Sequence, residues 1–443
     1  MKEYDDLLNR IRTHEARIGI IGLGYVGLPL ALAYAEKNFP VTGFDVDSVK
    51  TDALMRGESY IGHIASTRVV AAVKSGFLKA SSRFDGLKDQ DAIMICVPTP
   101  LTPQREPDMS YIVNTAREIK TRLRRRQIVI LESTTYPGTT DGILREILEE
   151  SGLKCGPDFL LAFSPEREDP GNPDSSVGRI PKVVGGVDAD SGDLAQALYD
   201  AVVAKTVRVS SARTAEAVKL TENIFRAVNI ALVNELKIVY DRMGIDVWEV
   251  IDAAATKPFG FMRFNPGPGW GGHCIPLDPF YLSWKSREYG IVPKFIELAG
   301  EINTDMPEWV VNKLASALNQ ARKPVHGSRI LILGLAYKKD VADTRESPSL
   351  EIMTMLENMG ALIAYHDPHV PEVPMTRHSP GRAGMRSVQL TPQTVATYDA
   401  VLVVTDHTQV DYAMVANHAK LVVDSRGVYH QRHPDLKKKI IQA

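Results

Sequence analysis

The chain has 443 residues, enough for two or three domains, and its 44% hydrophobic content lets each domain bury a core. A formal net charge of -2 creates no strong field of one sign, so we expect neither nucleic acid nor a membrane as a partner. Residues 1–17 are charged and lack the apolar core of a signal peptide or a membrane anchor. We therefore expect a cytoplasmic protein.

Short apolar runs alternate with helical patterns through the first half of the chain, which is typical of parallel βαβ units. The expected strands are "RIGIIG", "VTGFDV", "DAIMICV", "IVILES", "FLLAFS" and "PKVVGG", with "KTVRVS" closing the sheet before residue 211. We expect a doubly wound, Rossmann-like domain over residues 1–211.

A glycine motif follows the first expected strand. Gly22, Gly24 and Gly27 have the GxGxxG spacing directly before a helical pattern, where the glycines permit a tight turn, close approach of a pyrophosphate and close helix packing. Asp45 ends the next strand and would accept the ribose hydroxyls, which favours NAD over NADP. Lys50 leaves NADP open, because a cation there could tolerate a 2′-phosphate.

Polar side chains stand where two later strands end. Ser133 and Thr134 follow "IVILE", and Glu166 and Arg167 follow "FLLAF". Ligands of open α/β sheets bind beyond the carboxyl ends of the strands, so these residues are candidates for a site. Ordinary turn chemistry is the alternative interpretation.

A long helix is expected from Ala212 to Met243, since this segment contains neither proline nor glycine. At 1.5 Å per residue it spans about 45 Å, more than a small domain needs, and it fits a spine between two domains that also offers a dimer surface. Lys219 and Asn223 share one face of it. Pattern alone favours a solvated edge for that pair; a functional role would require the face to line a cleft.

Three widely separated cysteines form neither a disulfide framework nor a CxxC metal site, and we expect no metal. Cys96 lies in an apolar run and Cys155 beside a turn, so each fits a packing or surface role. Cys274 lies in "GPGWGGHCIPLDP", where glycine N–H groups could hold an oxyanion, and a nucleophile and a structural thiol are equally good interpretations. The adjacent His273 should point away from it.

Asp278 follows the cysteine by four residues and precedes Pro279 at the start of a helical pattern. The pair fits the N-cap and first-turn positions of a helix, a role that Asp278 can combine with one in a site. The loop over residues 267–279 that contains Cys274, called the Cys loop, belongs to a central helical region expected over residues 212–322.

The chain ends in a second α/β pattern. "SRILILGLAYKKD", "ALIAYHDP", "YDAVLVVTD" and "AKLVVDSRG" are strand-like runs separated by helical segments, and Pro371 to Pro392 fits a surface loop. We expect this second domain over residues 323–443. The predicted fold class is α/β, with two Rossmann-like doubly wound domains joined by a long central helix.

Taken in order, the motifs "GLGYVGLP", "VPTP", "STTYPGTT", "SPERE", "KLTEN", "GGHCIPLD" and "YKKDVADTRESP" resemble those of the UDP-glucose/GDP-mannose dehydrogenase family over nearly the whole chain. "RGESYIGHIAS" and "KPFGFMRFNPGPGWGGHCIPLDPFYLSWK" resemble the branch that acts on UDP-N-acetylhexosamines, UDP-GlcNAc first, for surface polysaccharide synthesis. UDP-GalNAc, UDP-ManNAc and UDP-glucose remain alternative substrates.

The resemblance implies an NAD-binding domain, a central dimerisation region and a UDP-sugar domain in a homodimer or higher oligomer. It also implies a four-electron oxidation of the sugar C6 alcohol through a thiohemiacetal and a thioester on a cysteine. The implied catalytic residues are Cys274, Lys219, Asn223, Asp278, Thr134 and Glu166.

The resemblance implies cofactor contacts from Gly22, Gly24, Tyr25, Val26, Gly27, Asp45, Lys50, Pro98, Thr99, Ser133, Thr134 and Arg345. It implies substrate contacts from Glu166, Arg167, Lys219, Asn223, Phe264, Gly267, Gly269, Gly271 and Lys338, with the loop from Phe264 to Gly272 closing over the sugar diphosphate.

One position departs from the pattern of the glucose-specific relatives. Where they have a second glutamate, four residues beyond the one that matches Glu166, this chain has Pro170. The contacts near sugar C2 should therefore differ, unless Arg167 or Glu168 fills that role.

Two other classes of function remain as alternatives. A two-electron dehydrogenase of the 3-hydroxyacid type would have no need of Cys274, and an NAD-responsive binding protein would need none of the catalytic set.

Overall fold

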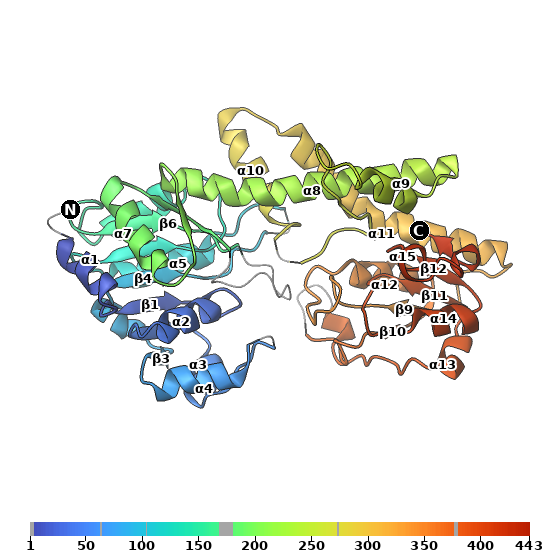
Figure 1. Cartoon of the computed structure of the whole chain (residues 1–443), viewed down its shortest axis with the longest axis horizontal. Helices are drawn as coiled ribbons and strands as arrows, with labels where there is room; N and C mark the ends of the chain where they lie inside the picture. The colour runs from blue at the N-terminus through green and yellow to red at the C-terminus, as the bar shows by residue number, and fades with distance from the viewer. Residues whose placement is uncertain (1–3, 63, 103, 168–179, 273, 376–379) are drawn as a thin grey trace. The chain divides into compact units, whose positions relative to one another are not determined.

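The structure, a computed structural model, describes residues 4–62, 64–102, 104–167, 180–272, 274–375 and 380–443. It divides into two compact units (Figure 1). The first comprises the chain up to Glu222 together with Trp284–Gly290, and the second comprises Asn223–Ser283 and Ile291–Ala443. Helix α8, Ala212–Met243, has the predicted bounds and contributes residues to both units.

An eight-stranded sheet forms the centre of the first unit, in the order β3-β2-β1-β4-β5-β6-β7-β8. All neighbouring pairs are parallel except β6 and β7. The strands are β1 (Ile18–Ile21), β2 (Val41–Phe44), β3 (Leu78–Ser81), β4 (Ala92–Ile95), β5 (Ile128–Leu131), β6 (Leu160–Phe163), β7 (Lys182–Gly186) and β8 (Thr206–Arg208).

Helices cover both faces of this sheet, because alternate strand residues point to opposite sides. Ile20 and Ile130 belong to a core with residues of α1, α2 and α7, whereas Ile21 and Leu131 belong to a second core with residues of α5, α6 and α8. The helices before α8 are α1 (Asp5–Arg12), α2 (Gly27–Glu36), α3 (Ser48–Met55), α4 (Ser66–Lys74), α5 (Ser110–Lys120), α6 (Arg145–Glu149) and α7 (Ala189–Asp200).

A five-stranded parallel sheet forms the centre of the second unit, in the order β10-β9-β11-β12-β13. Ile330 and Ile332 face a core shared with α11 and α12, and Leu331 and Leu333 face one shared with α14. The strands are β9 (Arg329–Leu333), β10 (Leu362–His366), β11 (Ala400–Val403), β12 (Val422–Asp424) and β13 (Ile441–Gln442).

The remaining helices include α10, whose last residues fall in the first unit. Asp278 is the first residue of α10 and not its predicted N-cap, because its N–H already bonds the carbonyl of Cys274. They are α9 (Val247–Ala254), α10 (Asp278–Ser286), α11 (Lys294–Gln320), α12 (Pro348–Asn358), α13 (Pro392–Ala396), α14 (Tyr412–His418) and α15 (Val428–Arg432). No helix among the described residues has both the length and the apolar composition needed to cross a membrane.

The two doubly wound sheets and α8 confirm the predicted fold class. Every strand expected from an apolar run is present. The sequence interpretation missed β3, a partly exposed strand at the edge of its sheet, and β13, which is two residues long.

Candidate functional site

The glycine turn between β1 and α2 has the geometry of a pyrophosphate cradle. Gly22 has φ 91°, and a Cβ there would lie 2.4 Å from the carbonyl oxygen of Cys96. A Cβ on Gly27 would lie 1.8 Å from the carbonyl oxygen of Gly22. A Cβ on Gly24 would meet nothing within 4 Å, so this side of the turn is open to a ligand at the start of α2. Tyr25 and Val26 complete the turn.

Asp45 lies beside that turn, at the end of β2. Its carboxylate accepts hydrogen bonds from the N–H of Leu23 at 2.9 Å and the N–H of Asp47 at 3.0 Å. The Nζ of Lys50 lies 3.5 Å from the same carboxylate. The carboxylate is therefore fixed next to the glycine turn, where the ribose of a dinucleotide would lie, and these residues fit NAD.

The loops after β4 and β5 are tied together at the same edge of the sheet as the glycine turn. The hydroxyl of Ser133 donates a hydrogen bond to the carbonyl oxygen of Val97 at 2.8 Å. Pro98 and Thr99 follow Val97, and the half-buried Thr134 follows Ser133. Because β1, β4 and β5 are parallel neighbours, their carboxyl ends bring these predicted cofactor residues to one side of the first unit.

Lys219 and Glu166 meet in the first unit. The Nζ of Lys219 donates a hydrogen bond to the backbone carbonyl of Glu166 at 2.7 Å, and Lys219 is only 7% exposed. Asn223, one turn further along α8, is 0% exposed. The solvated edge favoured by pattern alone is wrong, because tertiary contacts bury polar residues that the periodicity of the helix cannot distinguish from surface ones.

A buried ion-pair network behind Glu166 was missed from the sequence. The Nζ of Lys182 lies 2.7 Å from the carboxylate of Glu132 and 3.3 Å from that of Glu166, and the hydroxyl of Tyr199 also bonds Glu132. Burial alone would lower the pKa of Lys182, but the two carboxylates outweigh it and raise that pKa, so the ammonium stays charged. The sequence does contain a signal for this network: a charged residue stands next to a buried apolar run in two places, Glu132 after "IVIL" and Lys182 before "VV".

Arg167 is held in the first unit by two partners. Its Nη2 lies 2.5 Å from the carboxylate of Glu222 on α8, and its Nη1 donates a hydrogen bond to the carbonyl of Pro181 at 2.5 Å. A role for Arg167 at the sugar would require a rearrangement of these contacts.

Cys274, Asp278 and Asn223 lie close together in the second unit. Cys274 is half-buried in the turn that precedes α10, and its carbonyl accepts the N–H of Asp278 at 2.8 Å. The buried carboxylate of Asp278 accepts a hydrogen bond from the side-chain amide of Asn223, whose oxygen accepts one from Arg226. The partly accessible Cys274 is thus joined through its backbone carbonyl to the residue that carries the buried carboxylate-amide pair.

The other two cysteines differ from Cys274 in accessibility. Cys96 and Cys155 are buried, and burial raises the pKa of Cys96 and raises the pKa of Cys155 to about 12. A protonated, inaccessible thiol is a poor nucleophile. These two cysteines therefore pack the core, as predicted for Cys96.

The glycines before Cys274 permit close packing. A Cβ on Gly267 would lie 2.7 Å from the guanidinium of Arg426, and one on Gly271 would lie 2.6 Å from Tyr337. Gly269 has φ 124°. The ring of Phe264 lies 5.9 Å from that of Phe225 on α8. The loop is therefore packed on the second unit.

The Cys loop is also joined to the loop that carries Lys338 and Arg345. The N–H of Gly272 donates a hydrogen bond to the carbonyl of Arg345 at 3.0 Å. The Arg345 guanidinium pairs with Asp343 through Nη2 at 2.6 Å and Nε at 3.0 Å. Arg345 belongs to the second unit and the glycine turn to the first, so its contact with the cofactor stays a prediction.

Three residues discussed from the sequence lie outside the described part of the chain: Glu168, Pro170 and His273.

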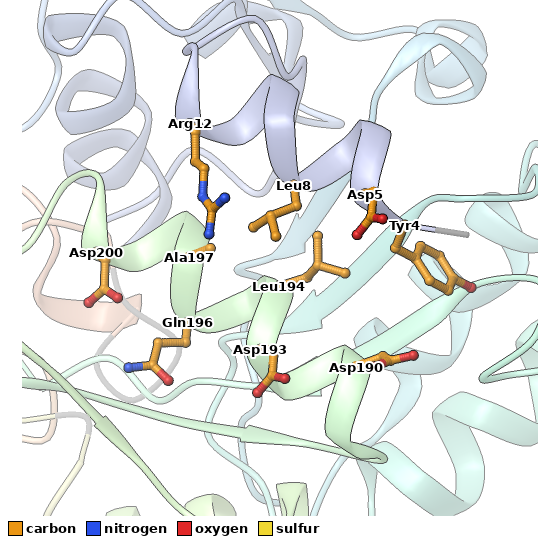
Figure 2. Close-up of a pocket in the computed structure, with 10 residues that line it drawn as sticks. All are labelled: Tyr4, Asp5, Leu8, Arg12, Asp190, Asp193, Leu194, Gln196, Ala197 and Asp200. Carbon is orange, nitrogen blue, oxygen red and sulfur yellow. The ribbon is translucent and has the colours of Figure 1, made fainter. Parts of the chain in front are cut away.

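A cavity of about 280 Å³ lies between α1 and α7 in the first unit (Figure 2). Aspartates from both helices, with Arg12, surround an apolar floor of Leu8, Leu194 and Ala197. No residue predicted for chemistry lines it.

Comparison with known proteins gives matches along most of the chain. Residues 16–203 match the NAD-binding domain of the UDP-glucose/GDP-mannose dehydrogenase family, residues 213–305 its central domain and residues 331–431 its UDP-binding domain. The first match confirms NAD as the cofactor.

Two named relatives match this chain over most of the length of both proteins. The UDP-N-acetyl-D-mannosamine dehydrogenase of Pyrococcus horikoshii is 34% identical over 422 residues, which are 93% of this chain and 96% of that protein. The UDP-N-acetyl-D-glucosamine 6-dehydrogenase of Pseudomonas aeruginosa is 36% identical over 358 residues, which are 80% of this chain and 83% of that protein.

Solved structures agree with these matches. A UDP-D-ManNAc dehydrogenase structure from Pyrococcus horikoshii has a TM-score of 0.84 at 33% identity, covering 93% of this chain and 96% of that one. An NDP-N-acetyl-D-galactosaminuronic acid dehydrogenase from Methanosarcina mazei has a TM-score of 0.81 at 30% identity, covering 100% and 97%.

Proposed function

This chain belongs to the UDP-glucose/GDP-mannose dehydrogenase family, and we propose that it oxidises the C6 alcohol of UDP-N-acetylglucosamine to a carboxylate. The observation that carries the proposal is the partly accessible Cys274, whose backbone carbonyl accepts the N–H of Asp278 while the buried carboxylate of Asp278 pairs with Asn223. Bound NAD supplies a hydride acceptor for each of two oxidation steps. The uronic acid then serves surface polysaccharide synthesis.

In the first step the C6 alcohol loses a hydride and a proton and becomes an aldehyde. Lys219 is the cation that stabilises the developing oxyanion, while Asn223 and Thr134 hold the oxygen or a water. The ammonium of Lys219 is already fixed against the Glu166 carbonyl, which limits its mobility.

In the second step the thiolate of Cys274 adds to the aldehyde carbon, and a proton on the oxygen completes a thiohemiacetal. Loss of the C6 hydrogen as a second hydride, together with the hydroxyl proton, gives a thioester. Water attacks the thioester, releases the acid and returns the thiol. Glu166 transfers the proton of that water, and Asp278 polarises Lys219 and the water.

Each of the three predicted domains has its own role in the proposed reaction. We assign NAD binding to residues 1–211, dimerisation and the cysteine to residues 212–322, and UDP-sugar binding to residues 323–443. The family match over residues 331–431 supports the last assignment. Lys338 and the loop from Phe264 to Gly272 would contact the nucleotide sugar, and their loops are hydrogen-bonded to each other through Gly272 and Arg345.

The choice of UDP-GlcNAc rests on the resemblance to the N-acetylhexosamine branch and on the 36% identical relative with that activity. UDP-ManNAc is the second candidate, because a relative named for it covers 93% of this chain.

A panel of UDP-sugars tests the assignment. We expect the highest kcat/KM, from NADH absorbance, with UDP-GlcNAc, followed by UDP-ManNAc, UDP-GalNAc and UDP-glucose. A preference for UDP-glucose would refute the assignment to N-acetylhexosamines, and a preference for UDP-ManNAc would move the protein to the second candidate.

A further inference from the structure

Three possible metal ligands meet at the carboxyl edge of the second sheet. Asp340 follows β9, His369 follows β10 and His407 follows β11, and these strands are neighbours in the sheet. Parallel strands deliver the residues after their carboxyl ends to one edge, which is where α/β sheets bind ligands. One side-chain ligand atom from each residue lies within 4.8 Å of the other two.

The separations suit a small divalent ion. Oδ1 of Asp340 lies 3.7 Å from Nε2 of His369 and 3.9 Å from Nδ1 of His407. Zinc bonds of about 2.1 Å at tetrahedral angles place two ligand atoms about 3.4 Å apart. Contraction by about 0.3 and 0.5 Å would therefore bring the Asp340 oxygen to tetrahedral distance from both imidazoles, and the two imidazole nitrogens, which lie within 4.8 Å of each other, would also move closer as the ion binds.

His407 is oriented as metal-binding histidines are. It is fully buried, and its Nε2–H donates a hydrogen bond to the buried carboxylate of Asp367 at 3.0 Å. That bond fixes the tautomer and turns the Nδ1 lone pair towards Asp340, as in carboxylate-histidine-zinc arrangements.

His369 supplies an independent observation. Its Nε2 is buried and has no hydrogen-bond partner within the described part of the chain, although the carboxylate of Asp340 is close. Most buried polar atoms have such a partner, so an unpaired one aimed at a carboxylate needs an explanation. A metal ion between the two residues provides it.

One existing hydrogen bond would be exchanged for a metal bond when an ion binds. Nδ1 of His407 now accepts the N–H of Asp340 at 3.0 Å, a bond that the metal would replace. Asp340 is exposed, so its N–H could then bond to water. The carboxylate of Asp340 accepts both donors of Thr408 and, with two oxygens, can still bind a metal.

We infer that Asp340, His369 and His407 form a binding site for a divalent transition-metal ion, with zinc as the best chemical fit. Two imidazoles and a carboxylate suit zinc, and water would complete the tetrahedron. The ion would tie the loop that carries Lys338 to the ends of β10 and β11.

Zinc titration of the full chain tests the inference. The experiment uses the protein stripped with EDTA, in a Cys274→Ser background that removes a competing thiol, and calorimetry with zinc chloride. We expect one zinc per chain. We expect His369→Ala to weaken binding by more than about tenfold, since the loss of a ligand should exceed the loss of an outer-shell partner. His418→Ala, at an exposed histidine on α14, should leave binding unchanged.

Thermal unfolding provides the second measurement. Zinc should raise the melting temperature of the parent and of His418→Ala, but not that of His369→Ala. Asp340→Asn replaces His369→Ala if the latter does not fold in EDTA. Absence of zinc binding, or equal affinity in the parent and in both ligand variants, would overturn the inference.

Discussion

Lys182 forms ion pairs with two carboxylates, one buried and one partly exposed. Both Lys182 and Glu132 are buried, and Lys182 also reaches Glu166 beside Lys219. Removal of one member of a buried ion pair leaves an uncompensated charge, which costs more than the pair contributes. The network thus connects the stability of the first unit to the position of the proposed proton-transfer residue.

Lys182→Met should destabilise the first unit by about 3–5 kcal/mol, because Glu132 would remain buried without its cation. The double variant Lys182→Met/Glu132→Gln should recover much of that loss, because it removes the charge and keeps an acceptor for Tyr199. Denaturant unfolding measures both variants. Equal unfolding free energies for wild type and Lys182→Met would contradict the role of the pair.

Individual polar residues were the hardest part of the site to predict. Cys274 could be singled out because glycines and prolines surround it, and Asp45 because of its spacing from the glycine turn. Burial of Lys219 and the pairing of Lys182 depend on contacts between residues 53 and 50 positions apart. No local pattern encodes such contacts.

At the scale of elements, strands and the long helix were predictable because their signals are local. Apolar runs mark the central strands, and α8 ends where Gly244 adopts φ 70°, a conformation typical of a residue after a helix. The edge strand β3 has only partial burial and therefore a weak apolar signal.

Helix α8 buries a lysine in the second unit. Lys237 donates a hydrogen bond to the carbonyl of Ser425 at 3.1 Å, and its Nζ lies 5.1 Å from the centre of the Trp309 ring. Burial lowers the pKa of Lys237 to about 7, and the attraction of Asp424 offsets only part of that effect. In the unfolded chain the lysine pKa is about 10.4.

Lys237→Met should remove a pH dependence from the stability of the fold. Between pH 7 and about 10.4 the unfolded wild-type chain holds a proton that the folded chain lacks, so wild-type stability rises with pH there, by up to about 1.4 kcal/mol per pH unit. The difference in melting temperature, wild type minus variant, should therefore increase from pH 7 to pH 10. A difference independent of pH would argue against a neutral Lys237.

At the scale of the whole molecule, α8 carries an exposed apolar stripe. Phe225, Leu232 and Val239 are 48%, 50% and 45% exposed and recur every seven residues, which places them on one face of the helix. Large exposed apolar side chains in a row are typical of an interface. The stripe supports the proposal that α8 forms a homodimer surface.

Leu232→Glu tests that proposal, because a carboxylate in an apolar interface is costly to desolvate. Sedimentation should find a dimer for wild type and a shift towards monomer for Leu232→Glu. Lys79→Glu, an added acid at the exposed edge of the other unit, is the matched control and should stay dimeric. A monomeric wild type, or a fully dimeric Leu232→Glu, would exclude this face.

The overall function follows from the ordered motifs, which cover nearly the whole chain, and the family matches agree with them. The sugar was less predictable, because relatives named for different N-acetylhexosamines have similar identity to this chain. The position that departs from the glucose-specific pattern, Pro170, also lies outside the described residues.

The most direct test of the central claim is the number of NADH molecules formed per sugar consumed. The proposed mechanism predicts two NADH for each UDP-N-acetylglucosamine, with the acid as product and no free aldehyde. Cys274→Ala should bind NAD normally but form no acid. One NADH per sugar with aldehyde released, or normal acid formation by Cys274→Ala, would contradict covalent oxidation at this cysteine.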